Sequence, residues 1–288
     1  MTAMLSLAEL ELLSPAESLL ELICSPEGGV LDCRDVLVVV AHPDDETIAI
    51  GGQLTRMQGV RLLHVTDGAP VNMADAEAQG FSRREDYAAA RRRELEAAVA
   101  VAGLGPEALL SFDVPDQSTA FRLSELSRRL ADLLQETEVG TVITHAYEGG
   151  HPDHDATAFI ARAACHLLGQ RNLPAPAVYE FPLYHMRHGE WVFQEFAPGH
   201  ELEFAIALDE EAAEMKRRML AAHVTQQRTL GTFRLKAERF RPAMPCDFHQ
   251  LPNEGEVLYG QFDWGLRPSD WPALVDKACR ELGLPKWL

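Results

Sequence analysis

The feature that most restricts the fold of this chain is a run of five apolar residues, VLVVV, at positions 36–40. A continuous β-branched run is typical of a strand buried on both faces, as in a parallel sheet. From there to residue 170, strand-like and helix-like segments alternate. This alternation predicts an α/β fold with a doubly wound, mostly parallel, Rossmann-like sheet, in which ligands bind beyond the carboxyl ends of the strands. The further expected strands are 60–68, 108–114 and 139–145, and the expected helices are 44–58, 82–103, 122–136 and a segment after HPDHD that ends near 169.

Segments outside this alternation are more mixed. The apolar residues within 5–23 are spaced as in an amphipathic helix, which predicts a helical N-terminal extension over 1–33. Residues 231–288 are expected to form a C-terminal extension that packs on the same domain. This extension would elaborate the C-terminal part of the α/β fold. Between these, the expected elements are a strand at 177–184, a hairpin around Pro198 and Gly199 within 191–208, and a helix over 209–227.

The charge balance disfavours some classes of partner. With 26 Lys and Arg against 44 Asp and Glu, the formal net charge is -18, whereas nucleic-acid binding depends on basic residues that neutralise phosphates. The same charge favours neutral or cationic substrates over phosphorylated ones. The sequence has no apolar run near the ~20 residues that span a bilayer, no basic residue before Arg34, and five cysteines without a CxxC pair. We therefore expect a cytoplasmic protein with no nucleic-acid or membrane partner, and the sequence leaves a homo-oligomer open.

Two stretches combine imidazoles and carboxylates at an expected strand end. AHPDDE occupies positions 41–46, and HPDHD occupies positions 151–155. Either stretch alone fits an ordinary helix start, because Pro suits the first helical turn and carboxylates there complement the helix dipole. Two such loops at the carboxyl ends of strands can instead meet in one cleft. A divalent cation in that cleft would make the clustered carboxylates favourable.

Spacing divides the side chains of the two motifs between faces. Residues three apart share a face of a helical turn, so His42 converges with Asp45, and His151 with His154, whereas Asp44 points elsewhere. One metal held by two His and one Asp keeps open positions, as in a catalytic site. Asp44 is then free to act as general base toward the water that the metal activates. The remaining histidine is placed to polarise a carbonyl or to protonate a leaving amine.

The paired motifs resemble those of the PIG-L/LmbE-like family of metal-dependent de-N-acetylases, which remove acetyl from N-acetylglucosamine-type groups. HVTDGA, RRRELEAAVAVAGLG and FDVPDQ resemble further family segments, so the resemblance covers about 34–230, the expected catalytic domain. It implies zinc, or another divalent metal, and an acetamido sugar or glycoconjugate as the small-molecule substrate. By position it assigns the metal ligands to His42, Asp45 and His154, the general base to Asp44, the carbonyl-polarising or acid histidine to His151, and a substrate-binding arginine to Arg91.

The sequence departs from the family pattern just before HPDHD. Gly149 stands where some family members have a tyrosine, so Tyr147 or Glu148 is expected to supply that substrate contact. Asp67 and Asp116, at strand ends, are further candidates for binding substrate hydroxyls.

Other polar residues are expected to have supporting or structural roles. Glu46 and Asp153 are expected to hold the metal ligands or the start of a helix in place. We interpret His64 and His166 as core residues and His185 and His188 as solvent-exposed, while His223 and Gln226 form the polar pair to test after the main site.

Other functions fit the same triad of ligands. An amidase acting on a thiol or other small-molecule conjugate would use the same mechanism to cleave a different amide bond. A non-haem iron oxygenase also uses two His and one carboxylate, but such enzymes need dioxygen and their all-β scaffold conflicts with the alternation here. A protein that only binds a ligand would need neither Asp44 nor His151. GxGxxG, P-loop, GxSxG and HExxH motifs are absent from the sequence, which disfavours the common nucleotide-binding, serine-hydrolase and zincin alternatives.

Overall fold

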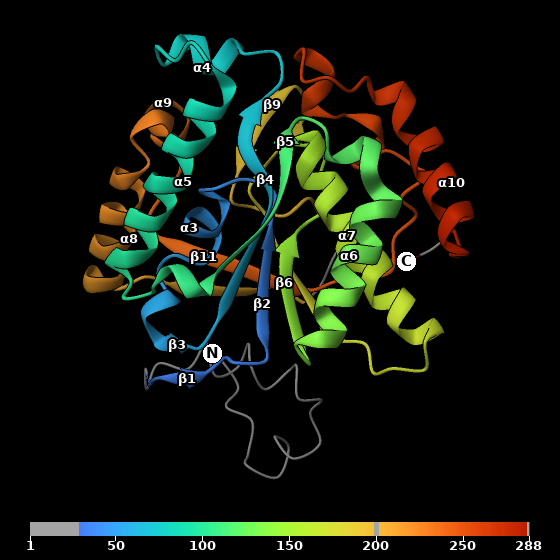
Figure 1. Cartoon of the computed structure of the whole chain (residues 1–288), viewed down its shortest axis with the longest axis horizontal. Helices are drawn as coiled ribbons and strands as arrows, with labels where there is room; N and C mark the ends of the chain where they lie inside the picture. Colours follow the sequence, from blue (N-terminus) through green and yellow to red (C-terminus); the bar gives the residue numbers. More distant parts are fainter. Residues whose placement is uncertain (1–28, 199–201, 287) are drawn as a thin grey trace.

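The computed structural model describes residues 29–198, 202–286 and 288. The helix expected within 5–23 lies outside the described residues. Figure 1 shows a central sheet with helices on both faces, which confirms the expected α/β fold class. Within the described part of the chain, no helix combines the length and the apolar character needed to cross a membrane.

The main sheet has seven strands in the order β10-β11-β7-β6-β2-β4-β5. Its centre is β2 (Val36–Val40), whose five residues are all buried. Strand order turns back at β2, because β4 lies on one side of it and β6 on the other, both parallel to it. Such a switch point opens a crevice at the carboxyl ends of the strands. The other strands are β4 (Arg61–Pro70), β5 (Leu109–Asp116), β6 (Thr141–His145), β7 (Ala177–Phe181), and the antiparallel β10 (Phe204–Ala207) and β11 (Ala237–Pro242).

Two apolar clusters fill the space between the sheet and the helices. One joins the sheet to α6, α7 and α10, and the other joins it to α3, α5 and α8. In Figure 1 these two groups of helices lie on opposite sides of the sheet. The helices are α3 (Asp45–Ile50), α4 (Ala74–Ala78), α5 (Arg84–Val101), α6 (Leu123–Glu136), α7 (Pro152–Gln170), α8 (Glu210–Ala222), α9 (Gln227–Leu230) and α10 (Trp271–Leu282).

The helix expected over 44–58 is wrong in length, because α3 ends at Ile50. In a longer helix the Gly52 amide would donate to the Ile48 carbonyl. Here the Lys216 ammonium donates to that carbonyl at 2.7 Å, and the Gly52 amide donates to Glu238 at 2.7 Å. A buried ion pair from α8 and β11 therefore ends α3, and the chain continues as a short 3-10 turn and β3 (Met57–Gln58), which pairs with β1 (Leu31–Asp32).

The hairpin expected around Pro198 and Gly199 is also wrong. β9 (Glu190–Phe193) pairs with the strand before it, β8 (Tyr184–Arg187), in a separate two-stranded sheet. β10 pairs with β11 at the edge of the main sheet. The turn of the observed hairpin is near Gly189, where φ is +78°, and Gly199 lies outside the described residues.

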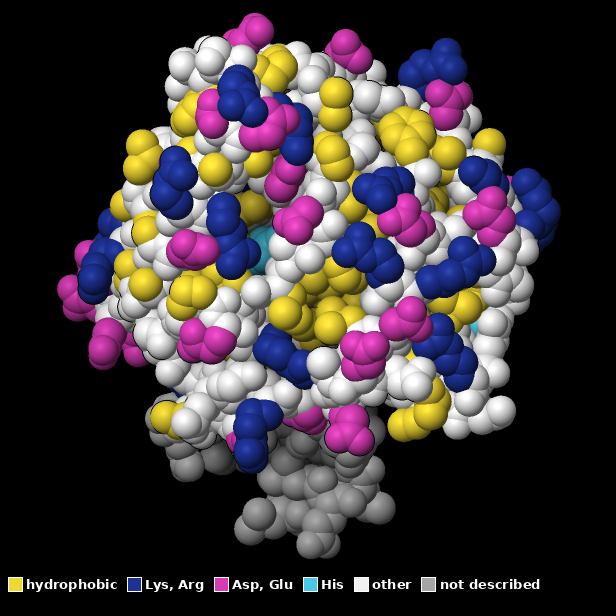
Figure 2. Space-filling model, in the orientation of Figure 1, with side chains coloured by type: hydrophobic (Ala, Val, Ile, Leu, Met, Phe, Trp, Pro, Cys, Tyr) yellow, Lys and Arg dark blue, Asp and Glu magenta, His cyan; other side chains and the backbone are white. Residues whose placement is uncertain are grey.

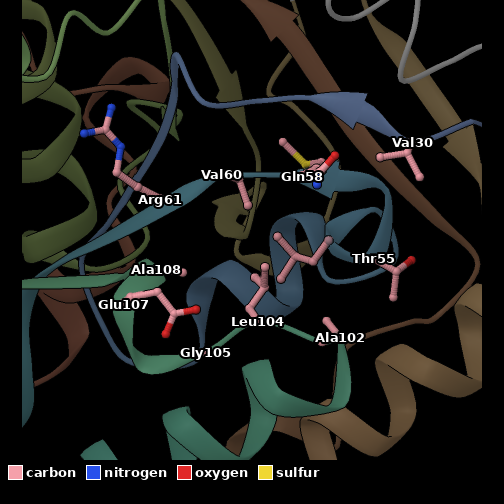
Figure 3. Close-up of a pocket in the computed structure, with 14 residues that line it drawn as sticks. Val30, Thr55, Gln58, Val60, Arg61, Ala102, Leu104, Gly105, Glu107 and Ala108 are labelled. Carbon is pink, nitrogen blue, oxygen red and sulfur yellow. The ribbon is translucent and has the colours of Figure 1, made fainter.

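The side chains on the face in Figure 2 mix both signs of charge, with basic groups interspersed among acidic ones. A cavity of about 520 Å³ lies at the opposite end of the sheet from the motifs, where β4 and β5 begin. Figure 3 shows that its wall is mainly apolar or uncharged, with Arg61 and Glu107 as its charged members. No histidine and no aspartate lines it, and the two motifs lie at the other end of the sheet.

Candidate active site

The two motifs meet at the carboxyl ends of β2 and β6. His42 follows β2, Asp45 begins α3, and His151 and His154 lie at the start of α7. His151 is the N-cap of α7, and its ring accepts a hydrogen bond from the Asp153 amide. The side chains of all four residues are at least nine-tenths buried. Strand ends and helix starts thus bring separate parts of the sequence to one point.

Donor atoms of His42, Asp45 and His154 lie close together, and the two carboxylate oxygens of Asp45 face different rings. His42 Nδ1 lies 3.2 Å from His154 Nε2 and 3.3 Å from Asp45 Oδ2, and His154 Nε2 lies 3.4 Å from Asp45 Oδ1. Ligands of a tetrahedral zinc with bonds of ~2.0–2.1 Å are about 3.3–3.4 Å apart. The shortest separations are thus of the size expected between ligands of one divalent ion, and the residues have the chemistry and the burial that such an ion needs.

Electrostatics in this cluster also fit a cation. Burial lowers the pKa of His154 to about 4 and so keeps its ring neutral, as metal binding requires. Burial would raise the pKa of Asp45, but the neighbouring His154 and His42 hold it well below its ordinary value. Burial would lower the pKa of His42, yet the carboxylates of Asp116 and Asp45 raise it well above its ordinary value. The carboxylates thus favour positive charge at this position.

His145 is a member of the cluster that the sequence did not reveal. It ends β6, its ring stacks on that of His154 at 4.2 Å, and its Nε2 lies 3.4 Å from Asp45 Oδ2. The same nitrogen accepts the Ala41 amide at 2.9 Å. Asp45, His145 and His154 are a second set that could hold an ion. The signal was weak because His145 stands alone at the end of VITH, although it occupies the same place on β6 as the first motif does on β2.

Asp44 lies beside the cluster in an unusual backbone conformation, with φ 155° and ψ -22°. Such conformations persist only where the surroundings enforce them, and they concentrate at functional sites. The Asp44 amide donates to Glu46 at 3.1 Å, and Arg91 donates to the Asp44 carboxylate at 3.0 Å. Burial raises the pKa of Asp44 to about 7, although Arg91 opposes this shift. A carboxyl group with this pKa can both accept and release a proton near neutral pH.

Arg91 therefore lies in the site, and the two terminal nitrogens of its guanidinium already donate to protein acceptors. Besides Asp44 it donates to the carbonyl oxygens of Gly68 at 2.7 Å and Pro43 at 3.0 Å. A Cβ at Gly68 would lie 2.6 Å from the Arg91 guanidinium carbon, so this close approach needs glycine. The expected substrate contact of Arg91 stays a prediction, and the structure adds that Arg91 orients Asp44.

His151 and Asp116 face the other side of the His42 ring. His42 Nε2 lies 3.0 Å from Asp116, and His151 Nε2 lies 3.9 Å from the same carboxylate oxygen. Burial lowers the pKa of His151 well below its ordinary value. Asp153, expected to hold a ligand in place, accepts the amides of Gln117 at 2.6 Å and Thr119 at 3.0 Å and is 3.5 Å from His42. It thereby ties the loop after β5 to the start of α7.

The remaining expected substrate residues are held by other contacts. Asp67 pairs with Arg84 at 2.7 Å. Tyr147 donates its hydroxyl to the Gln250 carbonyl at 2.8 Å, and its ring packs on Phe248. Glu148 is buried and accepts the amides of Leu183 and Tyr184 at 2.7 and 3.0 Å. The contacts of Tyr147 and Glu148 join the loop before HPDHD to residues 248–250 and 183–184, and a substrate role for Asp67, Tyr147 and Glu148 stays a prediction.

For the other histidines, the burial seen in the structure agrees only in part with the burial expected from the sequence. His64 is buried and lies 3.0 Å from Glu46 Oε2, as expected for a core residue with a partner. His166 was expected in the core but is exposed on α7, and His185 was expected to be exposed but is buried 3.3 Å from Glu148. His188 is exposed. His223 is buried with its Nε2 3.4 Å from the Thr47 hydroxyl, and Gln226 donates to the Tyr87 hydroxyl at 2.7 Å.

Comparison with known proteins supports the family resemblance. Residues 37–165 match the model of the PIG-L family, described as GlcNAc-PI de-N-acetylase. A 1D-myo-inositol 2-acetamido-2-deoxy-alpha-D-glucopyranoside deacetylase of Catenulispora acidiphila is 29% identical over 160 residues, covering 48% of this chain and 53% of the relative. A probable N-acetyl-alpha-D-glucosaminyl L-malate deacetylase of Bacillus cereus is 31% identical over 127 residues, covering 43% and 57%. The chain spans about half the length of these curated relatives.

Solved structures share the fold at lower sequence identity. The deacetylase of the A40926 pseudoaglycone aligns with a TM-score of 0.56 at 19% identity, over 73% of this chain and 97% of its own. An N,N'-diacetylchitobiose deacetylase from Pyrococcus horikoshii aligns with a TM-score of 0.52 at 18% identity, over 84% and 95%. At these identities the likeness shows the fold alone. All residues that could hold an ion lie within the matched range 37–165.

Proposed function

We propose that the chain is a metal-dependent hydrolase that removes acetyl from an N-acetylglucosamine-type substrate, because residues 37–165 match the PIG-L family model. The observation that carries this proposal is the set of donor atoms of His42, Asp45 and His154, 3.2–3.4 Å apart, with the Asp44 carboxyl beside them. Zinc is the proposed ion, because two imidazoles and one carboxylate in a tetrahedral arrangement suit it.

A divalent ion bound there would polarise the acetamide carbonyl and lower the pKa of a water molecule. Asp44 is placed to take the proton of the attacking water, and Arg91 keeps the Asp44 carboxylate directed toward the site. His151, whose lowered pKa keeps its ring neutral, is placed to donate a hydrogen bond to the developing oxyanion, and the proton that Asp44 accepts from water passes to the leaving amine. Water adds to the carbonyl carbon, the C–N bond breaks, and acetate and a free amine leave.

Purified protein incubated with N-acetylglucosaminides should release acetate and a free amine in equal amounts. A chelator should abolish the release, and added zinc should restore it. Turnover in the absence of dioxygen should be unchanged, whereas an iron oxygenase would stop. Release of an amine from a thiol conjugate, with no release from any acetamido sugar, would favour the alternative amidase.

The first variant to make is Asp44→Asn, which keeps the shape of the side chain and removes the base. General bases typically contribute ~10²–10⁴-fold, so kcat should fall by about that factor while bound metal, measured by elemental analysis, is retained. Asp45→Asn is the matched control, since it should lose the metal itself. Full turnover by Asp44→Asn would show that the base is assigned wrongly.

A further inference from the structure

A row of aromatic rings leads from the site histidines to the surface. The rings of Tyr184, Trp191, Phe262 and Trp264, here called the aromatic wall, come from β8, β9 and the segment before α10. Trp264 contacts the His151 ring at a centroid distance of 4.7 Å, and Tyr184 contacts the His154 ring at 5.3 Å. The wall therefore begins at two of the histidines that we place in the catalytic machinery.

The wall is continuous between these two ends. Trp264 stacks on Phe262 at 4.5 Å, Phe262 meets Trp191 edge-on at 5.9 Å, and Trp191 stacks on Tyr184 at 6.0 Å. Exposure increases outward, since Trp191 and Phe262 are 44% and 41% exposed. In Figure 1, β9 and the red segment before α10 lie near the end of the sheet where β4 finishes. An apolar surface thus connects the buried donors to solvent.

The wall is held in place from behind. The Trp191 ring stacks on Phe193 at 5.7 Å, and Phe193 packs edge-on against Phe233 at 5.5 Å. The Glu256 carboxylate accepts the amides of His188 and Gly189, at 2.9 and 2.6 Å, and so joins the β8–β9 turn to the C-terminal segment.

The same segment is joined to the loop before HPDHD. The Leu258 amide donates to the Gly149 carbonyl at 2.7 Å. A Cβ at Gly149 would lie 2.8 Å from Val257, and one at Gly150 would lie 2.1 Å from the Tyr184 carbonyl oxygen. The two glycines let both parts of the wall approach the site, which gives a reason for glycine at position 149, where some family members have a tyrosine.

The chemistry of the wall indicates what it binds. Its ring contacts are to other rings, whereas the two cation–π pairs among the described residues, Arg129 with Phe112 and Arg241 with Phe196, lie elsewhere. The four rings of the wall offer no positively charged group to pair with a phosphate or carboxylate. Exposed aromatic surface instead favours stacking with a flat apolar group.

Resting on the proposed function, we propose that the aromatic wall binds the group linked to the acetamido sugar and selects an uncharged aromatic aglycone. The wall lies outside the matched range 37–165, so it can differ among proteins that share the catalytic motifs. The acetyl group would be cleaved at the buried donors while the aglycone stacks on Trp191 and Phe262.

The test compares phenyl and methyl N-acetylglucosaminides, in both anomers. Aromatic stacking of ~0.5–1.5 kcal/mol corresponds to about two- to tenfold, so kcat/KM should favour the phenyl glycoside by at least that factor. Trp191→Ala and Phe262→Ala should bring the ratio close to one. Met244→Ala removes another exposed apolar side chain, 50% exposed and outside the wall, and should leave both the ratio and the activity unchanged.

Binding is measured separately by the tryptophan fluorescence of the protein titrated with phenyl glucosaminide, the amine product. Saturable change that weakens several-fold in Phe262→Ala supports the wall, even if no acetamido sugar is hydrolysed and the proposed function fails. Hydrolysis of phenyl and methyl glycosides at equal kcat/KM, unaltered in both wall variants, would overturn the wall and leave the proposed function intact. Preference for a glycoside with a carboxylate or phosphate on the aglycone would also overturn it.

Discussion

At the scale of single residues, Arg91 makes the contacts that are hardest to replace, apart from those of the proposed metal ligands. Its two terminal nitrogens reach three acceptors, the carbonyls of Gly68 and Pro43 and the carboxylate of Asp44. A lysine ammonium is a single point of charge and does not reproduce this fork. Arg91 thereby fixes a strained residue that the proposed reaction needs.

Arg91→Lys should therefore lower kcat by about tenfold or more, since even small misplacement of a catalytic group is costly. Bound metal should be unchanged, because the three donor atoms are not contacted. Arg92→Lys is the matched control, as Arg92 forms a half-exposed pair with Glu96 at 2.8 Å. Steady-state kinetics and metal analysis on the two variants check this, and equal rates in both would contradict it.

His223 makes stability depend on pH. Burial lowers its pKa to about 4, whereas an unfolded histidine has a pKa of ~6.5. Between these values the unfolded chain binds more protons than the folded chain, so the free energy of unfolding falls as pH is lowered from 6.5 toward 4.

His223→Gln should remove that part of the decline, at most ~1.4 kcal/mol per pH unit. Denaturant unfolding of both proteins from pH 7 to pH 4 measures the difference in slope. His188→Gln is the control, because His188 is exposed and its substitution should leave the slope unchanged. Parallel curves for the native protein and His223→Gln would refute the prediction.

At the scale of elements, the short helix α3 depends on residues distant in the sequence. Lys216 and Glu238 are buried and form an ion pair at 2.6 Å. Lys216 also donates to the Ile48 carbonyl, and Glu238 accepts the Gly52 amide. Removing one partner of a buried pair leaves an uncompensated charge, which typically costs ~3–5 kcal/mol. The start of α3 carries Asp45, so this pair, at the end of α3, helps to fix the helix that holds a proposed metal ligand.

Lys216→Met should thus lower the free energy of unfolding by about 3–5 kcal/mol. The double variant Lys216→Met/Glu238→Gln should be less destabilised than the sum of the single variants, because the two sites are coupled. Lys277→Met tests the exposed pair Lys277–Glu281, 3.8 Å apart, and should cost no more than ~1 kcal/mol. Denaturant titrations measure the free energy of unfolding of each variant. If the losses of the two single variants add up to that of the double variant, the two sites are not coupled.

The elements show which parts of the structure could be predicted from the sequence. β2 and α7 were recognised because their signals are local, namely a β-branched run and a Pro with carboxylates at an expected helix start. The end of α3 and the pairing of β10 were missed because both depend on later parts of the chain, Lys216 for α3 and β11 for β10. The pairing of β9 is local, with β8 directly before it, and was missed because the expected turn was placed after β9 and not near Gly189. His145 was missed for the same reason, since only the folded sheet brings it to His154.

At the scale of the whole molecule, the proposed metal site joins the two halves of the sheet. His42 and Asp45 come from the side that continues to β4, and His154 follows β6 on the other side of the switch point. The unfolded chain does not hold these donors together, so an ion bound by them stabilises the folded state. The size of this effect is about 2.7 kcal/mol when free metal is at one hundred times its Kd.

Zinc should therefore raise the Tm of metal-depleted protein, and a chelator should reverse the increase. Asp44→Asn should respond like the native protein, because its carboxyl is not among the donors, whereas Asp45→Asn should show little response. Differential scanning calorimetry with and without zinc measures this independently of any substrate. An equal rise in Asp45→Asn would place the ion elsewhere, and His145→Ala would then test the set formed by Asp45, His145 and His154. Loss of the response in Asp44→Asn would mean that Asp44 is a ligand, and the proposed general base would have to be sought among the groups around His151.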